Sequence, residues 1–450
     1  MPSTEPPARA THPTGDPVSV TSPVSAADPV SATDPVSDGA ASVRPGFRAL
    51  FRTPEFAPLF LATAAHTAAQ TVSGLALGTL VYRATDSPLL SALSMFGPSL
   101  AQVLGATLFL SGSDRLRPRA ALVGISVAFA AGTAALALPH LPIAGVFGVV
   151  VLLGLVASLG GGVRWGLLNE ILSKDGYLLG RSVFNMMSGI MQITGYAVGG
   201  VLVAVLSPRA SLLLSTALYL AGALVLRLGL TARPPRAAGR PSVAATWRTN
   251  AVLWSTRPRR LAYLGLWVPN GLVVGCESLY VSYAPSAAGT LFACAALGML
   301  VGDLTVGRLL PRGIRARLAT PLLVLLAVPY TVFALHPAVP LAAVCVAVAS
   351  VGFGASLVQQ ERLMALTSDE LSGHALGLHS AGMLTMQGVG AALAGSAAQL
   401  TSPGTAMTVL AAASLAVTLA LAAAGRGDGG TRGSDAVHGT PPPTGTSCPL

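Results

Sequence analysis

Long apolar runs, separated by short polar breaks, fill the chain from about residue 56 to residue 424. Most of these runs could cross the roughly 30 Å hydrocarbon core of a bilayer as helices that rise about 1.5 Å per residue. They lack the alternation of apolar and polar residues that is typical of membrane barrel strands. The pattern therefore predicts an all-α integral membrane protein with twelve transmembrane helices. These helices are expected at about 56–82, 88–111, 120–138, 142–165, 182–206, 210–229, 261–284, 286–307, 318–335, 338–362, 374–400 and 404–424.

Polar segments flank the apolar region at both ends. Residues 1–48 are rich in Pro and Ser and repeat a DPVS or SPVS tetrapeptide, and residues 425–450 form the second segment. Such sequences bury too little apolar surface to offset the entropy lost on ordering. We expect both segments to be disordered tails. The absence of an apolar run near Met1 also argues against an ordinary signal peptide.

The composition agrees with a membrane protein. Hydrophobic residues make up 52% of the chain and charged residues only 10%, whereas a soluble domain carries about a quarter charged residues. A formal net charge of +10 raises the question of a nucleic-acid partner. The arginines, however, stand in short runs between apolar segments and are not gathered on one predicted face. We therefore expect no nucleic-acid partner.

The cysteines give no sign of a metal or cofactor site. Cys276, Cys294 and Cys345 lie in apolar stretches, and Cys448 lies in the second tail. The chain contains no C-x-x-C motif and no spacing typical of a zinc site. We expect no cofactor and no bound metal.

Basic residues fall almost entirely on one side of the twelve-helix arrangement. Of the 27 Lys and Arg residues, only Arg83 and Arg209 lie in loops opposite the tails, which leaves 25 on the tail side. Cytoplasmic loops of membrane proteins carry the excess of Lys and Arg. The split predicts a multi-pass protein of the cell membrane, with both termini and the basic segment 231–260 in the cytoplasm.

The two halves of the apolar region repeat one another. A shift of 193 residues places Gly105 on Gly298 and Arg115 on Arg308, and the same shift relates further Gly, Leu, Pro and Arg residues. We expect two six-helix pseudo-repeats, at 49–230 and 261–424, joined by the linker 231–260. Repeats of this kind enclose a central cavity near the bilayer midplane, which is where transporters bind their substrates.

The loop after the second expected helix carries a recognisable motif. Asp114, Arg115, Arg119 and Leu122 match the signature loop between helices 2 and 3 of the major facilitator superfamily, which this region resembles. Asp303 and Arg308 form a weaker copy in the second half. The resemblance implies a transporter fold over about residues 50–424, and a gating role for Asp114, Arg115, Arg119, Asp303 and Arg308.

A second motif bears on the direction of transport. Residues 195–200 read Gly-Tyr-Ala-Val-Gly-Gly, which is similar to the G-P-x-x-G-G motif of drug–proton antiporters in this superfamily. Tyr196 stands where those proteins have Pro. The resemblance favours efflux of an actinobacterial drug or small-molecule type.

A carboxylate within an expected membrane helix is the clearest candidate for chemistry. An ionised group near the bilayer centre costs at least about 2.5–3.5 kcal/mol. Glu277 lies in such a position, and Asn270 and Tyr280 are spaced to share its helical face. We interpret Glu277 as a residue that couples transport to protons or binds a cation. The alternative is a structural acid that is hydrogen-bonded to a neighbouring helix.

Other polar residues in expected helices complete the candidate site. His66 shares a face with Thr63, Thr67 and Gln70, and either lines the cavity or packs as a hydrogen-bonded histidine. Asn185, Gln192 and Gln387 are further substrate candidates on two other helices. For Asp303, an ion pair with Arg308 or another loop arginine is the simpler interpretation.

The motifs favour transport over catalysis. The chain has no nucleotide-binding G-x-x-x-x-G-K-[ST], no H-E-x-x-H and no G-x-S-x-G. The sequence therefore predicts a secondary-active transporter. Its expected partners are a small-molecule substrate, protons and the lipid bilayer, with no obligate protein partner. Proton-coupled efflux of an amphipathic molecule is the first hypothesis. Proton-coupled uptake, or a sensor that has lost transport, are the alternatives.

Overall fold

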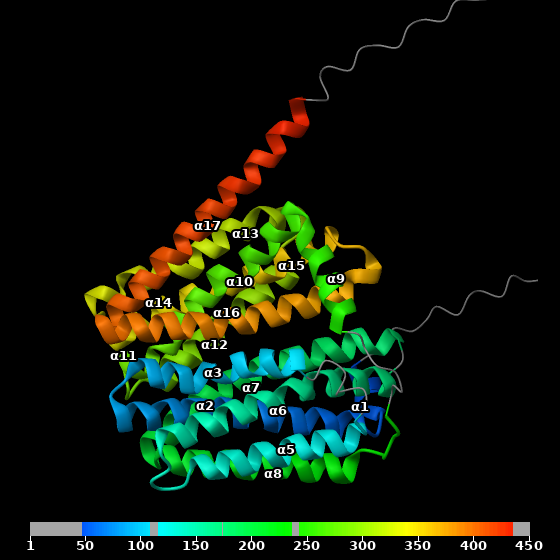
Figure 1. Cartoon of the computed structure of the whole chain (residues 1–450), viewed down its shortest axis with the longest axis vertical. Helices are drawn as coiled ribbons and strands as arrows, with labels where there is room; N and C mark the ends of the chain where they lie inside the picture. Colours follow the sequence, from blue (N-terminus) through cyan, green and yellow to red (C-terminus); the bar gives the residue numbers. More distant parts are fainter. Residues whose placement is uncertain (1–46, 109–115, 173, 236–242, 435–450) are drawn as a thin grey trace, which may run out of the picture. The chain divides into compact units, whose positions relative to one another are not determined.

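The computed structural model describes residues 47–108, 116–172, 174–235 and 243–434. Over these ranges the chain is all-helical, with 89% helix and no strand. Most of the helices run alongside one another in a bundle (Figure 1). Residues 1–46 of the predicted tail 1–48 and residues 435–450 of the predicted tail 425–450 lie outside the described residues, and Phe47 and Arg48 begin α1.

The first group of helices covers the half that the sequence predicts at 49–230. It consists of α1 (Phe47–Arg52), α2 (Phe56–Thr85), α3 (Pro88–Leu108), α5 (Pro118–Leu136), α6 (Ile143–Ile171), α7 (Lys174–Val205) and α8 (Pro208–Gly229). Helix α2 packs against α7 and α8, α3 packs against α6, and α5 bridges α6 and α8. Proline begins α3, α5 and α8, because its fixed φ suits the first turn of a helix.

The second group begins with a helix inside the predicted linker. It consists of α9 (Val243–Ser255), α10 (Arg257–Ser278), α11 (Tyr280–Tyr283), α12 (Ala288–Leu304), the π-helical turn η1 (Thr305–Leu309), α13 (Arg312–Ala327), η2 (Val328–Leu335), α14 (Val339–Val351), η3 (Gly352–Gly354), α15 (Ala355–Ala365), η4 (Asp369–Leu371), α16 (Ser372–Leu400) and α17 (Pro403–Ser434). Helix α10 packs against α16 and α17, and α12 packs against α14.

Helical segments lie at each of the predicted ranges, and three departures from the prediction bear on the site and its surroundings. Residues 231–260 were expected to be a plain linker, but they contain α9 and the start of α10. The tail predicted from residue 425 begins as helix, because α17 continues to Ser434. The seventh helix is broken at Leu279 into α10 and α11.

Ten helical segments among the described residues are long and apolar enough to cross a membrane. Helices α2 and α16 have the length but are not among the ten. Both carry polar residues in mid-helix, such as His66 and Gln70 in α2 and Gln387 in α16, and these lower their hydropathy. The least apolar of the long helices are therefore those whose polar side chains lie inside the bundle.

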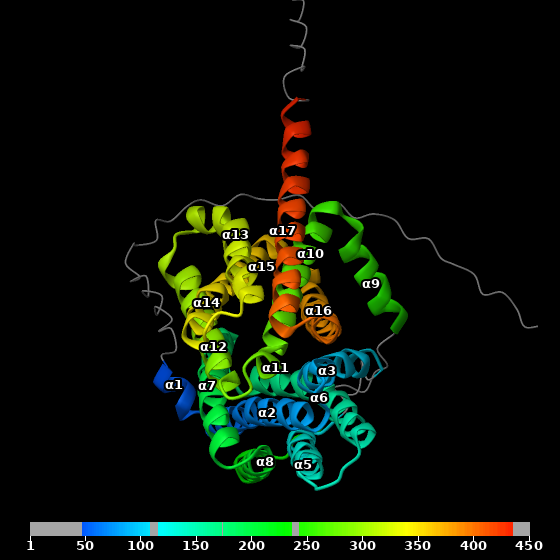
Figure 2. The ribbon, with the colours of Figure 1, turned by 90° about the vertical axis from the view of Figure 1, so that its left-hand side faces the viewer.

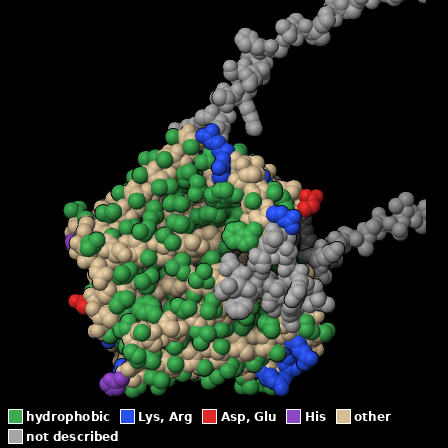
Figure 3. All heavy atoms as spheres, in the orientation of Figure 1, with side chains coloured by type: hydrophobic (Ala, Val, Ile, Leu, Met, Phe, Trp, Pro, Cys, Tyr) green, Lys and Arg blue, Asp and Glu red, His purple; other side chains and the backbone are tan. Residues whose placement is uncertain are grey.

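Large apolar side chains cover the outside of the bundle. Leu61, Leu152, Val201 and Leu341 are more than half exposed, and hydrophobic side chains dominate the face drawn in Figure 3. Soluble proteins rarely expose contiguous apolar surface of this extent, whereas lipid-facing surfaces do so routinely. The exposed surface is therefore that of a protein embedded in a membrane.

The two groups meet along two pairs of helices. Helix α3 packs against α16 and α7 packs against α12, and Figure 2 shows the groups side by side. We call the end of the bundle with the turns at 86–87, 206–207 and 284–287 the hairpin end. The opposite end, which carries the segment between α8 and α10, is the linker end.

Candidate functional site

A cavity of about 470 Å³ lies between the two groups of helices. Its walls come from α2, α3 and α7 of the first group and from α10, α12, η3, α15 and α16 of the second. The polar residues that line it are Thr67, Gln70, Thr71, Ser99, Gln102, Gln192, Tyr196, Asn270, Glu277, Asp303, Ser356 and Gln387. The large apolar ones are Leu75, Met95, Phe96, Val274, Phe292, Met299, Phe353, Met383 and Leu384.

Glu277 and Asn270 lie on the cavity wall formed by α10. Seven residues, or about two helical turns, separate them, so their side chains share one face. Glu277 is 5% exposed and Asn270 is 4% exposed. The buried Oε1 of Glu277 and Oδ1 of Asn270 both lack a hydrogen-bond partner among the described residues. The cavity wall therefore has two buried acceptors that no described residue satisfies.

The alternative role for Glu277, as a structural acid bonded to a neighbouring helix, finds no support in these contacts. No hydrogen bond or ion pair joins its carboxylate to another described residue. A buried, unpaired carboxylate is costly, and such groups in membrane helices usually belong to a functional site.

Tyr280 does not line the cavity, although the sequence places it on the face of Glu277. The break at Leu279 moves Tyr280 into α11, where it is fully buried and shares a hydrogen bond with the Tyr330 hydroxyl. Its ring contacts Phe292 edge to face, with centroids 4.8 Å apart. Tyr280 therefore packs against Phe292, which lines the cavity, without lining the cavity itself.

An aromatic pair connects the two groups at the cavity. The rings of Tyr196 on α7 and Phe292 on α12 stack with centroids 4.6 Å apart and an interplanar angle of 15°. Both residues line the cavity. The pair gives the binding space a flat apolar surface close to the carboxylate of Glu277, which lines the same cavity.

Amide side chains approach the cavity from several helices. Gln192 and Gln387, both predicted as substrate candidates, line it from α7 and α16. Gln102 on α3 also lines it and was missed by sequence reasoning. The spacing of Met95, Ser99 and Gln102 could have indicated it, because these residues share one face of an otherwise apolar helix and two of them are polar.

Asp303 lies on the cavity wall, which differs from the expected pairing. It is exposed and lines the cavity from α12, one residue before the last of that helix. Among the described residues, neither Arg308 nor another arginine forms an ion pair with it. Arg308 follows five residues later, in the π-helical turn η1, and its side chain is exposed.

His66 belongs to a different, much smaller cavity. It lies inside the first group, in a space of about 20 Å³ that Arg164 and Ser126 also line. The imidazole contacts Phe129 and Tyr219 edge to face, with centroids 4.8 Å and 5.0 Å away. These contacts are typical of a packing residue, so the structure does not bring His66 to the candidate site.

The remaining candidates lie away from the cavity. Asn185 on α7 is exposed and is not among the lining residues. Asp114 and Arg115 lie outside the described residues. Arg119 at the start of α5 donates a 2.5 Å hydrogen bond to the carbonyl oxygen of Arg227 near the end of α8. Arg308 is exposed in η1.

Close contacts join the two groups at the hairpin end. Gly200 on α7 faces Gly289 on α12 so closely that a Cβ on Gly200 would lie 2.7 Å from the Cα of Gly289. Gln399 of α16 donates a 3.0 Å hydrogen bond to the Ser87 hydroxyl, just before α3. These contacts bring the groups together on one side of the cavity.

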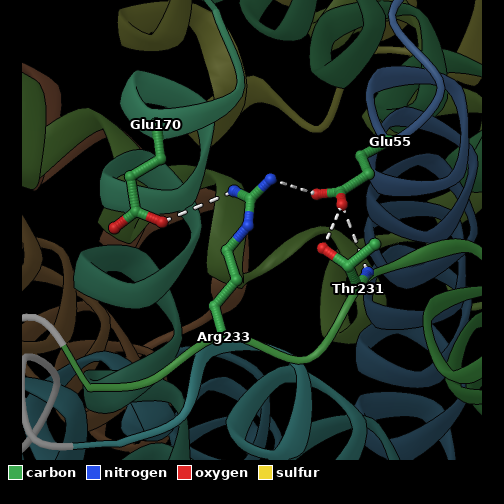
Figure 4. Close-up of polar contacts among 4 residues, drawn as sticks. All are labelled: Glu55, Glu170, Thr231 and Arg233. Atoms are coloured by element: carbon green, nitrogen blue, oxygen red, sulfur yellow. Dashed lines mark hydrogen bonds and ion pairs between the residues drawn. The ribbon is translucent and has the colours of Figure 1, made fainter.

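At the linker end, a polar cluster ties the first group to the chain that leaves it (Figure 4). The Glu55 carboxylate accepts hydrogen bonds from the backbone N–H of Thr231, at 3.2 Å, and from its hydroxyl. Arg233 lies 3.0 Å from Glu55 and 3.5 Å from Glu170. The cluster holds the first residues after α8 against the start of α2 and the end of α6.

The charged side chains on the cavity wall are all acidic. Glu277 and Asp303 line it, and no Lys, Arg or His does so among the described residues. The wall therefore favours a ligand that donates hydrogen bonds or carries positive charge, next to an apolar surface.

No family model matches the chain, and no curated protein matches it. Solved structures do. A POT family transporter in complex with 5-aminolevulinic acid has a TM-score of 0.68 at 11% identity, over 84% of this chain and 97% of that one. A mutant of the nucleoside transporter NupG has a TM-score of 0.66 at 12% identity, over 82% and 98%. A bacterial homolog of the human lysosomal transporter Spinster, inward-facing and unoccupied, has a TM-score of 0.56 at 13% identity, over 81% and 93%.

Identities this low show likeness of fold alone. The chain shares the fold of these transporters. Together with ten helical segments able to cross a bilayer, the likeness identifies a multi-pass membrane protein.

Proposed function

We propose that the chain is a secondary-active transporter that moves a small molecule across the cell membrane. Twelve transmembrane helices would form two six-helix pseudo-repeats, which rock around the cavity to expose it to each side in turn. The likeness of fold to solved transporters supports this proposal. The domain limits proposed are 49–230 and 261–424, with both tails and the segment 231–260 in the cytoplasm.

One observation carries the proposal: Glu277 is buried in the wall of a cavity between the two groups, and its Oε1 has no hydrogen-bond partner among the described residues. Folding does not require an unpaired carboxylate there, since a hydrophobic residue would pack at lower cost. A transport cycle does require a group that binds a proton or a cation in one state and releases it in another. We assign this role to Glu277.

The cavity wall indicates the substrate class. It combines two carboxylates and four glutamines with the Tyr196–Phe292 pair and three methionines. An amphipathic organic cation, such as an aromatic amine, matches this wall, because its charge can pair with Glu277 while its ring lies on an aromatic face. Asn270 and Gln387 would accept or donate the remaining hydrogen bonds.

We propose efflux in exchange for protons as the direction. The reason is the Gly195–Gly200 segment, which resembles an antiporter motif. Its last residue, Gly200, is also the residue that contacts Gly289 across the two groups. With the linker end in the cytoplasm, the contacts at the hairpin end would close the external side. The cavity would then be ready to receive a substrate from the cytoplasm.

The test is transport by the purified full-length chain in proteoliposomes. A panel of organic cations and matched neutral analogues is supplied under an imposed pH gradient, and proton movement and substrate movement are recorded together. Opposite movement of protons and a cation supports the proposal. Movement in the same direction indicates an uptake symporter. No movement of any compound, from protein that is folded and inserted, indicates the transport-inactive alternative.

A further inference from the structure

The segment that joins the two groups of helices is basic and carries two tryptophans. Residues 231–260 contain seven Arg and no Asp or Glu, together with Trp247 and Trp254. Its central part forms α9, a helix of 13 residues. A flexible connection between two rocking groups needs neither a helix nor tryptophan. The composition therefore points to a further role for this segment.

Helix α9 lies across the direction of the other helices. In Figure 1 it runs crosswise near the ends of α10 and α15, and Figure 2 looks down most of the helices and shows α9 beside α16, outside the bundle. It contacts α10 and α16. The helix therefore lies outside the bundle, at the linker end.

The end of α9 next to α10 is fixed to the second group. Leu253 is fully buried, and the Trp254 ring stacks on Trp267 of α10 with centroids 5.5 Å apart and an angle of 11°. The Arg259 guanidinium donates a 3.0 Å hydrogen bond to the Val252 carbonyl, and its Nε donates to the Thr256 hydroxyl at 2.7 Å. These contacts hold α9 at a defined orientation relative to α10.

Exposed apolar and basic side chains lie along the rest of α9. Trp247 is 62% exposed and Val252 is 51% exposed. Arg248 on α9 and Arg260 at the start of α10 are exposed as well. Tryptophan favours the boundary between hydrocarbon and headgroups, and arginine near that boundary is attracted to anionic lipids.

We propose that α9 is an interfacial helix that binds anionic phospholipid headgroups of the leaflet at the linker end. Trp247 and Val252 enter the boundary between acyl chains and headgroups, and the arginines pair with headgroup phosphates. Charge complementarity selects this partner, since the 30-residue segment has seven positive charges and no negative one. Because α9 is fixed to α10, the lipid surface would bias the position of the second group. The inference depends on the proposed membrane placement but not on transport or substrate.

The test uses the full-length chain in vesicles and does not measure transport. Trp247 fluorescence is isolated as the difference between the wild type and Trp247→Phe, and it is quenched with brominated phosphatidylglycerol or brominated phosphatidylcholine at equal mole fractions. We expect stronger quenching by the anionic lipid, weakened by added salt. Each arginine near an anionic surface should contribute a preference of about fivefold.

Matched variants separate the role of charge from that of folding. Arg248→Gln with Arg260→Gln should lose most of the preference for phosphatidylglycerol. Arg83→Gln with Arg209→Gln, which removes two exposed arginines at the hairpin end, should retain it. Equal quenching by both lipids in the wild type would overturn the assignment to anionic headgroups. Absence of quenching by either lipid, with Trp247 open to aqueous iodide, would show that α9 faces water or another partner.

Discussion

Gly200 of α7 and Gly289 of α12 face each other where the two groups of helices meet at the hairpin end. A Cβ on Gly200 would lie 2.7 Å from the Cα of Gly289, closer than real Cβ contacts come. Only glycine allows the two backbones to approach this closely. If the groups separate at this end during transport, the pair acts as a contact that forms in one state only.

Gly200→Ala should therefore disfavour the state in which the hairpin end is closed. Overpacking of a close contact typically costs about 1–3 kcal/mol, which is enough to change a two-state ratio by roughly fivefold or more. We expect slower transport. A cysteine at Ser99, on the cavity wall, should also react faster with an impermeant reagent added from the hairpin side. Gly189→Ala on the same helix is the control, because its Cβ meets nothing within 4 Å. Equal effects of both substitutions would contradict this interpretation.

The proposed topology is tested by labelling in whole cells. In a background without the native cysteines, Arg83→Cys should react with an impermeant maleimide from outside, because Arg83 is exposed near the hairpin end of α2. Arg248→Cys on α9 should react only after the cells are permeabilised. Labelling of both positions in intact cells would exclude an odd number of spans between them, and with it the proposed twelve-helix topology.

The cluster at Glu55 should stabilise the first group through a paired buried charge. Glu55 is 8% exposed, whereas Arg233 has 29% of its side chain exposed. Arg233→Gln leaves the carboxylate without its cation, and an unsatisfied buried group costs about 1–3 kcal/mol. We expect a lower midpoint of thermal unfolding in detergent for this variant.

Glu55→Gln is the matched variant for that measurement. It keeps an oxygen that can accept from Thr231 but removes the buried charge, so the midpoint should fall less than with Arg233→Gln. The reverse order would show that the hydrogen bonds to Thr231, and not the ion pair, stabilise this end of the bundle.

The fold could be predicted from sequence because the bilayer restricts it strongly. Runs of about 20 apolar residues leave few structures other than helices, so the positions of the membrane helices followed from length and composition. Helix α9 was missed, because its 13 residues contain basic and polar side chains that resemble an ordinary linker. Its defining contact, Trp254 on Trp267, joins two helices and leaves no local periodic signal.

Part of the candidate site was also predicted, because polar residues are conspicuous in apolar helices. Glu277, Asn270, Gln192 and Gln387 stand out as polar residues in apolar helices, and all four line the cavity. His66 stands out equally but lies in another cavity, because successive turns of α2 meet different neighbours. Sequence spacing shows which residues share a face of a helix. Which neighbouring helix or cavity that face contacts, at each position along its length, depends on how the helices pack.

Glu277→Gln should separate substrate binding from proton coupling. The amide keeps the shape of the side chain and removes both its charge and its ability to release a proton. We expect loss of uphill, pH-driven transport in proteoliposomes, with exchange down a gradient partly retained, because the cavity and its aromatic surface remain. Binding of an organic cation should weaken more than binding of its neutral analogue, since only the cation loses a charged partner.

The control for Glu277 is His66→Gln. His66 packs against Phe129 and Tyr219 in the separate small cavity, so its loss should lower stability or rate without removing the dependence on the pH gradient. If Glu277→Gln still accumulates substrate with the normal dependence on pH, proton coupling belongs to another carboxylate. Asp303 is then the next candidate, because it is the second acidic residue on the same wall. Asp303→Asn should in that case abolish uphill transport. Adding Glu277→Gln to Asp303→Asn should then cause no further loss of uphill transport.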